Sequence, residues 1–118
     1  MMKGGRKMAE KPSTAKEIIE TEMPRAFNPE KAQGLQATFQ FELLGEGGGN
    51  WVVNIADGRC EVQEGMAEKP DVIISMSTED YIAMAKGELE AVRAFMAGKS
   101  IVKGDINLAA KITSLFNL

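Results

Sequence analysis

The stretch that decides the fold is LQATFQFEL, residues 35–43, because its apolar side chains alternate strictly with polar ones. A period of two places successive side chains on opposite faces of a strand. We therefore expect a strand with one buried face and one solvated face. The inward face of this strand is formed by Leu35, Ala37, Phe39, Phe41 and Leu43.

Two further strands follow at hairpin spacing. After the glycine-rich loop at residues 45–49, the segment NWVVNIA (residues 50–56) places Trp51 and Val53 on one face. The dipeptide Asp57-Gly58 favours a tight hairpin, since both of its residues tolerate the positive φ that such a turn needs. The alternation then continues through RCEVQ, residues 59–63. The three strands together predict an antiparallel meander with one wet face.

The second half of the chain changes between strand and helix. DVIISMS has inward Val72, Ile74 and Met76, and STEDYIAMAKG begins with Ser77 or Thr78 as the helix cap. Glycines end two helical segments, and a final amphipathic segment begins after Asp105. The expected elements are strands over 71–77 and 100–104 and helices over 77–87, 88–98 and 105–116.

The N-terminal half carries helix signals of its own. In STAKEIIETEM, residues 13–23, Thr14 and Glu17 have the spacing of a capping box, and Pro24 is expected to end or kink the helix. One or two helical turns are expected over residues 28–34. The predicted class is α+β, with a five-stranded sheet made of the antiparallel meander and the two later strands, and with helices covering one face.

Length and charge limit the classes of partner. The chain has 118 residues, of which 44% are hydrophobic and 26% charged, as in an ordinary single-domain protein. We expect residues 1–12 to be a disordered basic tail and residues 13–118 to be one domain. Residues 1–11 carry a net charge of +3 and the whole chain −3, so the remaining residues carry −6. An acidic body disfavours nucleic acid as a partner, and no apolar run reaches the ~20 residues of an integral membrane segment.

The residue inventory also excludes much chemistry. The chain contains one cysteine, Cys60, and no histidine. A single cysteine gives no sign of an oxidising compartment, so a cytoplasmic location is expected. Without histidine there is no histidine-based catalytic triad and no histidine-ligated metal. Cys60 points inward without a visible activating base, so we expect an inert thiol, no cofactor and no enzymatic activity.

Two motifs suggest nucleotide binding but lack its context. AGKS, residues 97–100, is similar to the end of a phosphate-binding loop, yet Arg93 stands where that loop requires a glycine. A helix is expected before this motif and a strand after it, which reverses the required order. The glycine-rich loop at residues 45–49 lies between two strands, so it is not a dinucleotide-binding fingerprint. We therefore interpret AGKS as a helix end followed by a strand start.

NWVVNIADGRCEV (residues 50–62) and the segment from Pro70 to Phe116 together resemble the sterol carrier protein type 2 domain. The resemblance rests on the order of several short motifs, and it covers residues 13–118. These motifs are Trp51-Val52-Val53, Asp57-Gly58, Asp71-Val72, Ser77 through Tyr81, and Phe95 with Gly98-Lys99 and Gly104. The family often has an Asn-Pro break where this chain has residues 89–92, so a smoother helix is expected there.

The resemblance implies a sheet covered by helices around an apolar tunnel. Family members bind sterols, fatty acids, fatty acyl-CoA or other lipids without a metal, alone or fused to enzymes of lipid metabolism. The resemblance thus favours non-catalytic binding of a lipid or fatty acyl ligand, and its transfer. Two alternatives stay open: an interaction module of the same fold, without ligand, that docks to a lipid-metabolism enzyme, and a small enzyme acting on acyl-CoA.

The candidate ligand-binding residues are the apolar side chains expected to face this tunnel. They come from the inward faces of the strands and from the later helices, and the flexible methionines among them suit ligands of variable shape. No lysine or arginine stands out as a headgroup partner, so backbone amides and hydroxyls near the tunnel mouth are expected in that role. The candidates are Phe39, Phe41, Trp51, Val53, Ile74, Met76, Tyr81, Met84, Phe95, Met96, Leu108 and Ile112.

Overall fold

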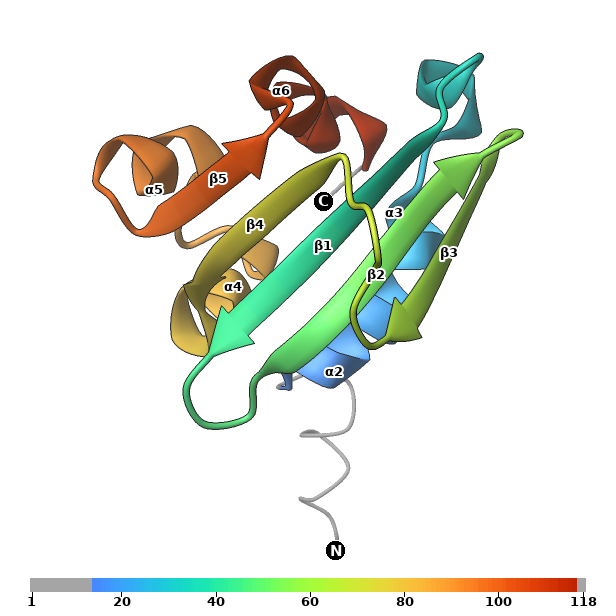
Figure 1. The fold of residues 1–118 in the computed structure, drawn as a ribbon. Helices are drawn as coiled ribbons and strands as arrows, with labels where there is room; N and C mark the ends of the chain where they lie inside the picture. Colours follow the sequence, from blue (N-terminus) through green and yellow to red (C-terminus); the bar gives the residue numbers. More distant parts are fainter. Residues whose placement is uncertain (1–13, 117–118) are drawn as a thin grey trace, which may run out of the picture.

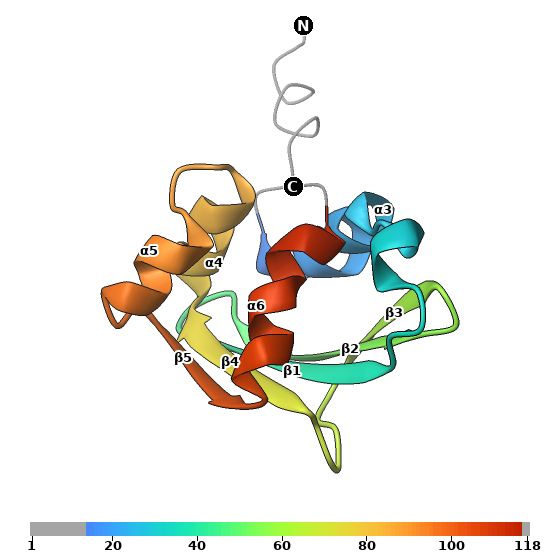
Figure 2. The ribbon, with the colours of Figure 1, turned by 90° about the horizontal axis from the view of Figure 1, so that it is seen from above.

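A five-stranded sheet carries the described helices on one of its faces, so the predicted α+β class is confirmed (Figures 1 and 2). The structure is a computed structural model that describes residues 14–116. The predicted tail at residues 1–12 therefore lies outside the described residues. The strands, in the spatial order β3-β2-β1-β4-β5, are β1 Ala37–Leu44, β2 Gly49–Ala56, β3 Arg59–Glu64, β4 Val72–Ser77 and β5 Ser100–Gly104.

The helical elements divide into an N-terminal group and a C-terminal group. The first group contacts β3 and the second contacts β4 and β5 (Figure 2). The first group is α2 Ala15–Glu17, η1 Ile18–Glu22, α3 Met23–Ala26 and η2 Pro29–Ala32, where η1 is a π-helix and η2 a 3-10 helix. The second group is α4 Thr78–Ala85, α5 Ala91–Met96 and α6 Ile106–Leu115.

The first three strands form the predicted antiparallel meander. Phe41 is paired with Trp51 across β1 and β2, and Val53 with Val62 across β2 and β3. Asp57 and Gly58 both have positive φ, 54° and 71°, which is the geometry of a tight hairpin that matches the strand twist. The hairpin signal in the sequence is thus confirmed.

The later strands join the free edge of β1. β4 runs parallel to β1, with Phe41 opposite Ile74, and β5 runs antiparallel to β4. The chain reaches β4 through residues 65–71, which cross the sheet face opposite the helices (Figures 1 and 2). Gln40, which sequence alternation places on the wet face, lies under this segment and is only 1% exposed.

The first helix begins as predicted but does not end where expected. The Thr14 hydroxyl accepts a hydrogen bond from the Glu17 backbone N–H at 3.2 Å, as in a capping box. The helix was expected to end or kink at Pro24. It does not end there, because α3 continues to Ala26. A π turn precedes the proline, and the Met23 backbone N–H donates to Ile18 five residues earlier. Pro24 then stands in the first turn of α3, where proline is tolerated.

The expectation of a smoother helix at residues 89–92 is also wrong. α4 ends at Ala85, Gly87 has a φ of 79°, and Glu90 is extended, so α5 begins only at Ala91. Glycine adopts this positive φ without strain, and it turns the chain between the two helices.

The core lies between the sheet and the helices. The final helix, α6, is capped by Asp105, whose carboxylate accepts from the Leu108 N–H at 3.1 Å. Its end is fixed where the ring of Phe116 contacts that of Phe27, with centroids 5.6 Å apart. No helix within residues 14–116 is long and apolar enough to cross a membrane. The largest fully buried apolar side chains are Trp51, Phe39, Ile19, Ile55, Leu115, Val53 and Val72.

Candidate functional site: an apolar cavity under the C-terminal helices

An apolar cavity of about 230 Å³ lies between one half of the sheet and the three C-terminal helices. β1, β4 and β5 supply one wall, and α4, α5 and α6 supply the rest. Its lining residues are Phe41, Ile74, Met76, Tyr81, Met84, Ala91, Val92, Phe95, Ser100, Val102, Ile106, Ala109, Ala110 and Ile112.

Strand register explains the wall that the sheet provides. Ile74 is paired with Phe41 on one side and with Val102 on the other, so three inward side chains form a row across β1, β4 and β5. Two positions along β4, Met76 is paired with Ser100 and forms a second row. Both rows point to the helical face because residues two apart on a strand share a face.

Helical spacing explains the opposite walls. Tyr81 and Met84 are three residues apart on α4, and Val92 and Phe95 have the same separation on α5. α6 contributes side chains that include Ala109, and its small alanines leave room that larger residues would fill. The cavity therefore exists where the three helices meet the sheet with small or flexible side chains.

The cavity opens toward solvent between α5 and α6. Three of its lining side chains are well exposed: Val92 at 65%, Phe95 at 49% and Ile106 at 52%. Such large apolar side chains at a rim form an exposed apolar surface that an apolar ligand can contact on entry.

The lining carries no charged side chain among the residues that the structure describes. Its hydroxyl groups belong to Tyr81 and Ser100. The Tyr81 hydroxyl donates a weak hydrogen bond to the sulfur of Met23 at 3.9 Å, and burial raises the pKa of Tyr81 well above its usual value. Tyr81 is thus neutral at physiological pH, and the cavity is suited to hydrocarbon rather than to an ion.

The other reactive side chain, Cys60, lies on β3 and does not line the cavity. Burial, with a smaller effect of Glu61, raises the pKa of the Cys60 thiol to about 11. The thiolate is therefore a minor species near neutral pH, as in an inert structural cysteine. Within residues 14–116, no cluster of three or more histidine, cysteine or acidic side chains could hold a metal ion.

Seven of the twelve candidate residues line the cavity, namely Phe41, Ile74, Met76, Tyr81, Met84, Phe95 and Ile112. The structure places the other five elsewhere. Phe39, Trp51 and Val53 are buried in the core, and Leu108 is half-buried against it. Met96 is 79% exposed at the end of α5, so it faces solvent rather than the cavity.

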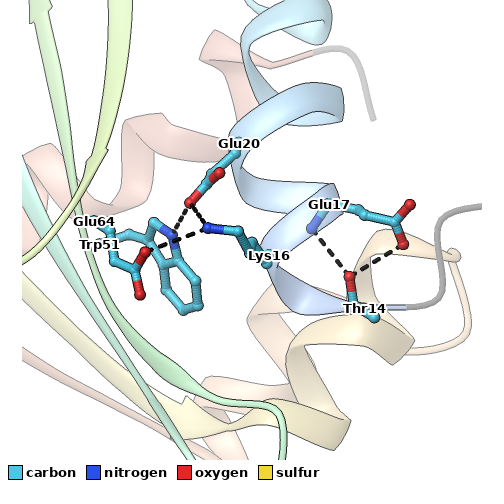
Figure 3. Close-up of polar contacts among 6 residues, drawn as sticks. All are labelled: Thr14, Lys16, Glu17, Glu20, Trp51 and Glu64. Carbon is cyan, nitrogen blue, oxygen red and sulfur yellow. Dashed lines mark hydrogen bonds and ion pairs between the residues drawn. The ribbon is translucent and has the colours of Figure 1, made fainter.

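A polar network shows why the Trp51 half of the sheet is filled. The Trp51 indole donates to Glu20 of the N-terminal helix at 2.7 Å, and Lys16 contacts Glu20 at 3.0 Å and Glu64 at 3.3 Å (Figure 3). The bond from Trp51, with help from Lys16, lowers the pKa of Glu20. The network connects the N-terminal helix to β2 and β3, and the apolar side chains of Ile18, Ile19 and Trp51 are buried there.

Seven lining residues were missed by sequence reasoning. Two of them, Ser100 and Val102, alternate on a segment that was correctly predicted as a strand, so its period could have identified them. Val92 lies three residues before the candidate Phe95 and could have been found by helical spacing. The others are Ala91, Ile106, Ala109 and Ala110, for which the sequence offered no signal beyond small size or position on a helix.

Comparison with known protein families identifies this fold. Residues 16–117 match the SCP-2 sterol transfer family. The chain belongs to the SCP-2 family. The resemblance drawn from the sequence motifs is thus confirmed, and the cavity is a feature of an SCP-2 domain.

Curated relatives of this SCP-2 domain are longer proteins. It is 40% identical over 91 residues to hydroxysteroid dehydrogenase-like protein 2 of Rattus norvegicus, covering 76% of this chain and 17% of that protein. It is 36% identical over 116 residues to the Xenopus laevis protein of the same name, covering 96% of this chain and 28% of that protein. The chain therefore spans less than a third of the length of these relatives.

Solved structures show the same SCP-2 fold. The crystal structure of sterol carrier protein 2 like 2 from Aedes aegypti aligns with a TM-score of 0.71 and 27% identity, covering 96% of this chain and all of that one. A solution structure of palmitated SCP2L2 from the same organism aligns at 0.72 and 25% identity, covering 86% and 93%. The sec-alkylsulfatase Pisa1 from Pseudomonas sp. shares the fold alone, with a TM-score of 0.71 and 16% identity over 81% of this chain and 15% of that one.

Proposed function

We propose that this domain binds a lipid with an apolar chain, such as a fatty acid or fatty acyl-CoA, in the cavity under α4, α5 and α6. The observation that carries the proposal is an uncharged, apolar cavity with an exposed apolar rim, inside a domain of the SCP-2 family. The seven candidate residues that line the cavity are the proposed ligand contacts.

The energetics of the cavity support this proposal. The cavity opens between α5 and α6, so water can enter it, but an apolar lining offers that water few hydrogen-bond partners. Each methylene group buried in such a space contributes about 0.8 kcal/mol before association costs. Hydrocarbon that displaces this water thus gains contact with the apolar lining.

Size and charge support a particular orientation of the ligand. The cavity volume of about 230 Å³ is below the ~300–1,000 Å³ of pockets that enclose a whole drug-sized ligand. It therefore suits one end of a longer chain. Because the lining is uncharged, a carboxylate or phosphate is expected outside the rim, in contact with water.

A relative gives independent support for an acyl ligand. The Aedes aegypti SCP2L2 structure is described as palmitated, and it is 25% identical to this chain. We extend the proposal to transfer of the lipid. The exposed rim formed by Val92, Phe95 and Ile106 would let the hydrocarbon chain of the lipid leave without opening the sheet. A cytoplasmic location stays a prediction from the sequence.

We assign no catalytic step to this domain. The support is chemical: the thiol of Cys60 has a raised pKa and lies outside the cavity, and the described lining residues include no acid or base other than the neutral Tyr81. An acyl-transfer or hydrolytic step needs an activated nucleophile or a positioned base.

The second part of the proposal is that this domain acts together with an enzyme of lipid metabolism. The relatives named hydroxysteroid dehydrogenase-like protein 2 carry a region similar to this chain within a much longer polypeptide. We propose that this domain likewise serves such an enzyme by holding its apolar substrate or product. The interaction module without a ligand remains the alternative, and the cavity favours the version that binds lipid.

Native mass spectrometry and thermal melting test the proposal together. The protein as purified is expected to carry a co-purified lipid, and after delipidation its melting temperature is expected to rise with added dodecanoic or hexadecanoic acid. A ligand at 100 times its Kd stabilises the fold by about 2.7 kcal/mol. A lipid-free protein whose melting temperature does not respond to either acid would contradict the proposal.

A further inference from the structure

Ser100 is a buried polar residue in the otherwise apolar wall of the cavity. It begins β5, pairs with Met76 and is only 8% exposed. Strand pairing explains why the side chain at this position points inward. It does not explain the hydroxyl, since an alanine has nearly the same size and would fit the same place. The choice of serine therefore needs a chemical reason.

The hydroxyl of Ser100 makes no hydrogen bond to any other residue within 14–116. The other buried polar side chains do: Thr78 donates to the Leu44 carbonyl at 2.8 Å, and the Gln40 amide donates to the Gly65 carbonyl at 3.0 Å. Tyr81, the second hydroxyl of the lining, is directed to the sulfur of Met23. In the described part of the chain no fully enclosed side-chain polar atom lacks a partner, so the Ser100 hydroxyl is not fully enclosed, and Ser100 lines the open cavity.

A ligand that fills the cavity removes the Ser100 hydroxyl from water, which is costly unless the ligand bonds to it. Burial of a hydroxyl without a hydrogen bond costs on the order of 1–3 kcal/mol in proteins. A purely hydrocarbon ligand would impose that cost. A charged group would bond to the hydroxyl but would meet no compensating cation, because no lysine, arginine or histidine lines the cavity among residues 14–116. A neutral oxygen satisfies the hydroxyl without this penalty.

We propose that Ser100 determines specificity by hydrogen bonding to a neutral hydroxyl or carbonyl oxygen on the part of the ligand inside the cavity. The preferred ligand is then an oxygenated lipid, such as a hydroxylated or keto fatty acyl chain, rather than a plain saturated one. This inference rests on the proposed function, and it adds the chemical class of the ligand. If the domain serves an enzyme that oxidises or reduces lipid alcohols, this preference would select the oxygenated substrate or product of that enzyme.

The test compares matched ligands on matched variants of the whole chain. Isothermal titration calorimetry would measure the affinity for dodecanoic acid and for a series of monohydroxydodecanoic acids with the hydroxyl moved along the chain. The variants are Ser100→Ala, which removes the hydroxyl, and Ser100→Thr, which keeps it. The control is Ser75→Ala, because Ser75 lies on the opposite face of β4, donates to Glu42 at 2.8 Å and does not line the cavity.

The protein is expected to prefer at least one hydroxy acid over dodecanoic acid. Ser100→Ala should weaken binding of that acid about threefold to tenfold, the effect of one hydrogen bond, and should leave binding of dodecanoic acid unchanged or stronger. Ser100→Thr should keep the preference, and Ser75→Ala should change neither affinity.

Each other outcome has a distinct meaning. If the native protein binds these acids but Ser100→Ala affects the plain and hydroxylated acids equally, or neither, the role of Ser100 is overturned and lipid binding stands. If the native protein binds none of them and its melting temperature does not change, lipid binding itself is overturned, and the role of Ser100 with it.

Discussion

The indole of Trp51 donates a 2.7 Å hydrogen bond to Glu20, whose carboxylate also accepts from Lys16 (Figure 3). This pairing satisfies the one polar atom of a large side chain that is otherwise in the core. At the residue scale, the contact explains why Trp51 belongs to the solid half of the sheet and not to the cavity. The sequence identified the inward face of Trp51 but not its partner, because Glu20 lies 31 residues away.

Replacement of Glu20 by glutamine should lower stability in a pH-dependent way. Because the native contacts lower the pKa of Glu20 from its ordinary 4.5, its carboxylate stabilises the fold above that pH and loses this effect as the pH falls through the lowered native pKa. Glu20→Gln should therefore cost about 1 kcal/mol at pH 7, and less near pH 3. Urea unfolding of both proteins at several pH values measures this difference. A difference that is independent of pH would contradict the role of the charge.

The thiol of Cys60 gives a second prediction at this scale. Burial raises its pKa from 9.0 to about 11, so the thiolate fraction at pH 8 is about a hundredfold lower than for an ordinary thiol. Reaction with a thiol-specific disulfide reagent should be slower by about that factor in the native protein than in the same protein unfolded in urea. Since this is the chain's single cysteine, the signal has one source. Equal rates in both states would show an accessible thiol with an ordinary pKa.

At the scale of elements, the segment between β3 and β4 is the part that sequence periodicity did not foresee. Strict alternation placed Gln40 on the wet face of β1, yet residues 65–71 cross that face and Gln40 is buried. Alternation reports which side chains share a face, but not what covers that face, because the cover comes from a distant segment. The same limit explains why the parallel pairing of β1 and β4 was not predicted.

Gln40→Ala should destabilise the fold much more than a solvated glutamine would. Its amide donates to the carbonyls of Gly65 and Trp51 at 3.0 and 3.2 Å, and its oxygen accepts from the Ala67 N–H at 2.6 Å. Loss of these bonds leaves backbone groups unsatisfied under the crossing segment, at an expected cost of about 2–3 kcal/mol.

Urea unfolding provides the comparison, with Gln36→Ala as the control because Gln36 is exposed. Hydrogen exchange at the Ala67 amide should also become faster in Gln40→Ala, since that amide loses its acceptor. Equal stability of the two alanine variants would mean that the Gln40 network does not hold the crossing segment in place.

Turn and cap residues were the elements that the sequence predicted best. Thr14, Ser77 and Asp105 all cap helices as expected, and Asp57-Gly58 forms the hairpin. These signals are local, so a short window of sequence contains their physical cause. The break at Glu90 was missed because no proline marks it, and Gly87 was read only as the end of the preceding helix.

At the scale of the whole molecule, the inward face of the sheet divides into a filled half and a hollow half. The N-terminal helices cover the half that contains Trp51, and α4, α5 and α6 surround the cavity on the other. The strand candidates were drawn from the whole inward face, which is why Phe39, Trp51 and Val53 lie away from the cavity. The division depends on which helix packs over which strand, and that is a property of the assembled fold.

The small residues of α6 give the sharpest test of this division. Ala109 lines the cavity, and Ala109→Leu would place three additional carbon atoms in it. Filling an empty apolar space commonly stabilises a protein by about 0.5–2 kcal/mol. Because the same space is needed by the ligand, we expect fatty-acid affinity to fall at least about tenfold while the melting temperature of the ligand-free protein stays level or rises.

Ala56→Leu is the matched control, since it adds the same atoms on β2, outside the cavity lining. It should leave fatty-acid affinity unchanged, as measured by titration calorimetry on both variants. In Ala109→Leu, a fall in affinity without a fall in stability distinguishes a filled binding site from general damage, because a misfolded variant would lose both. If Ala109→Leu binds fatty acid as tightly as the native protein, the lipid occupies some other part of the molecule, and the cavity under α6 is only a packing defect.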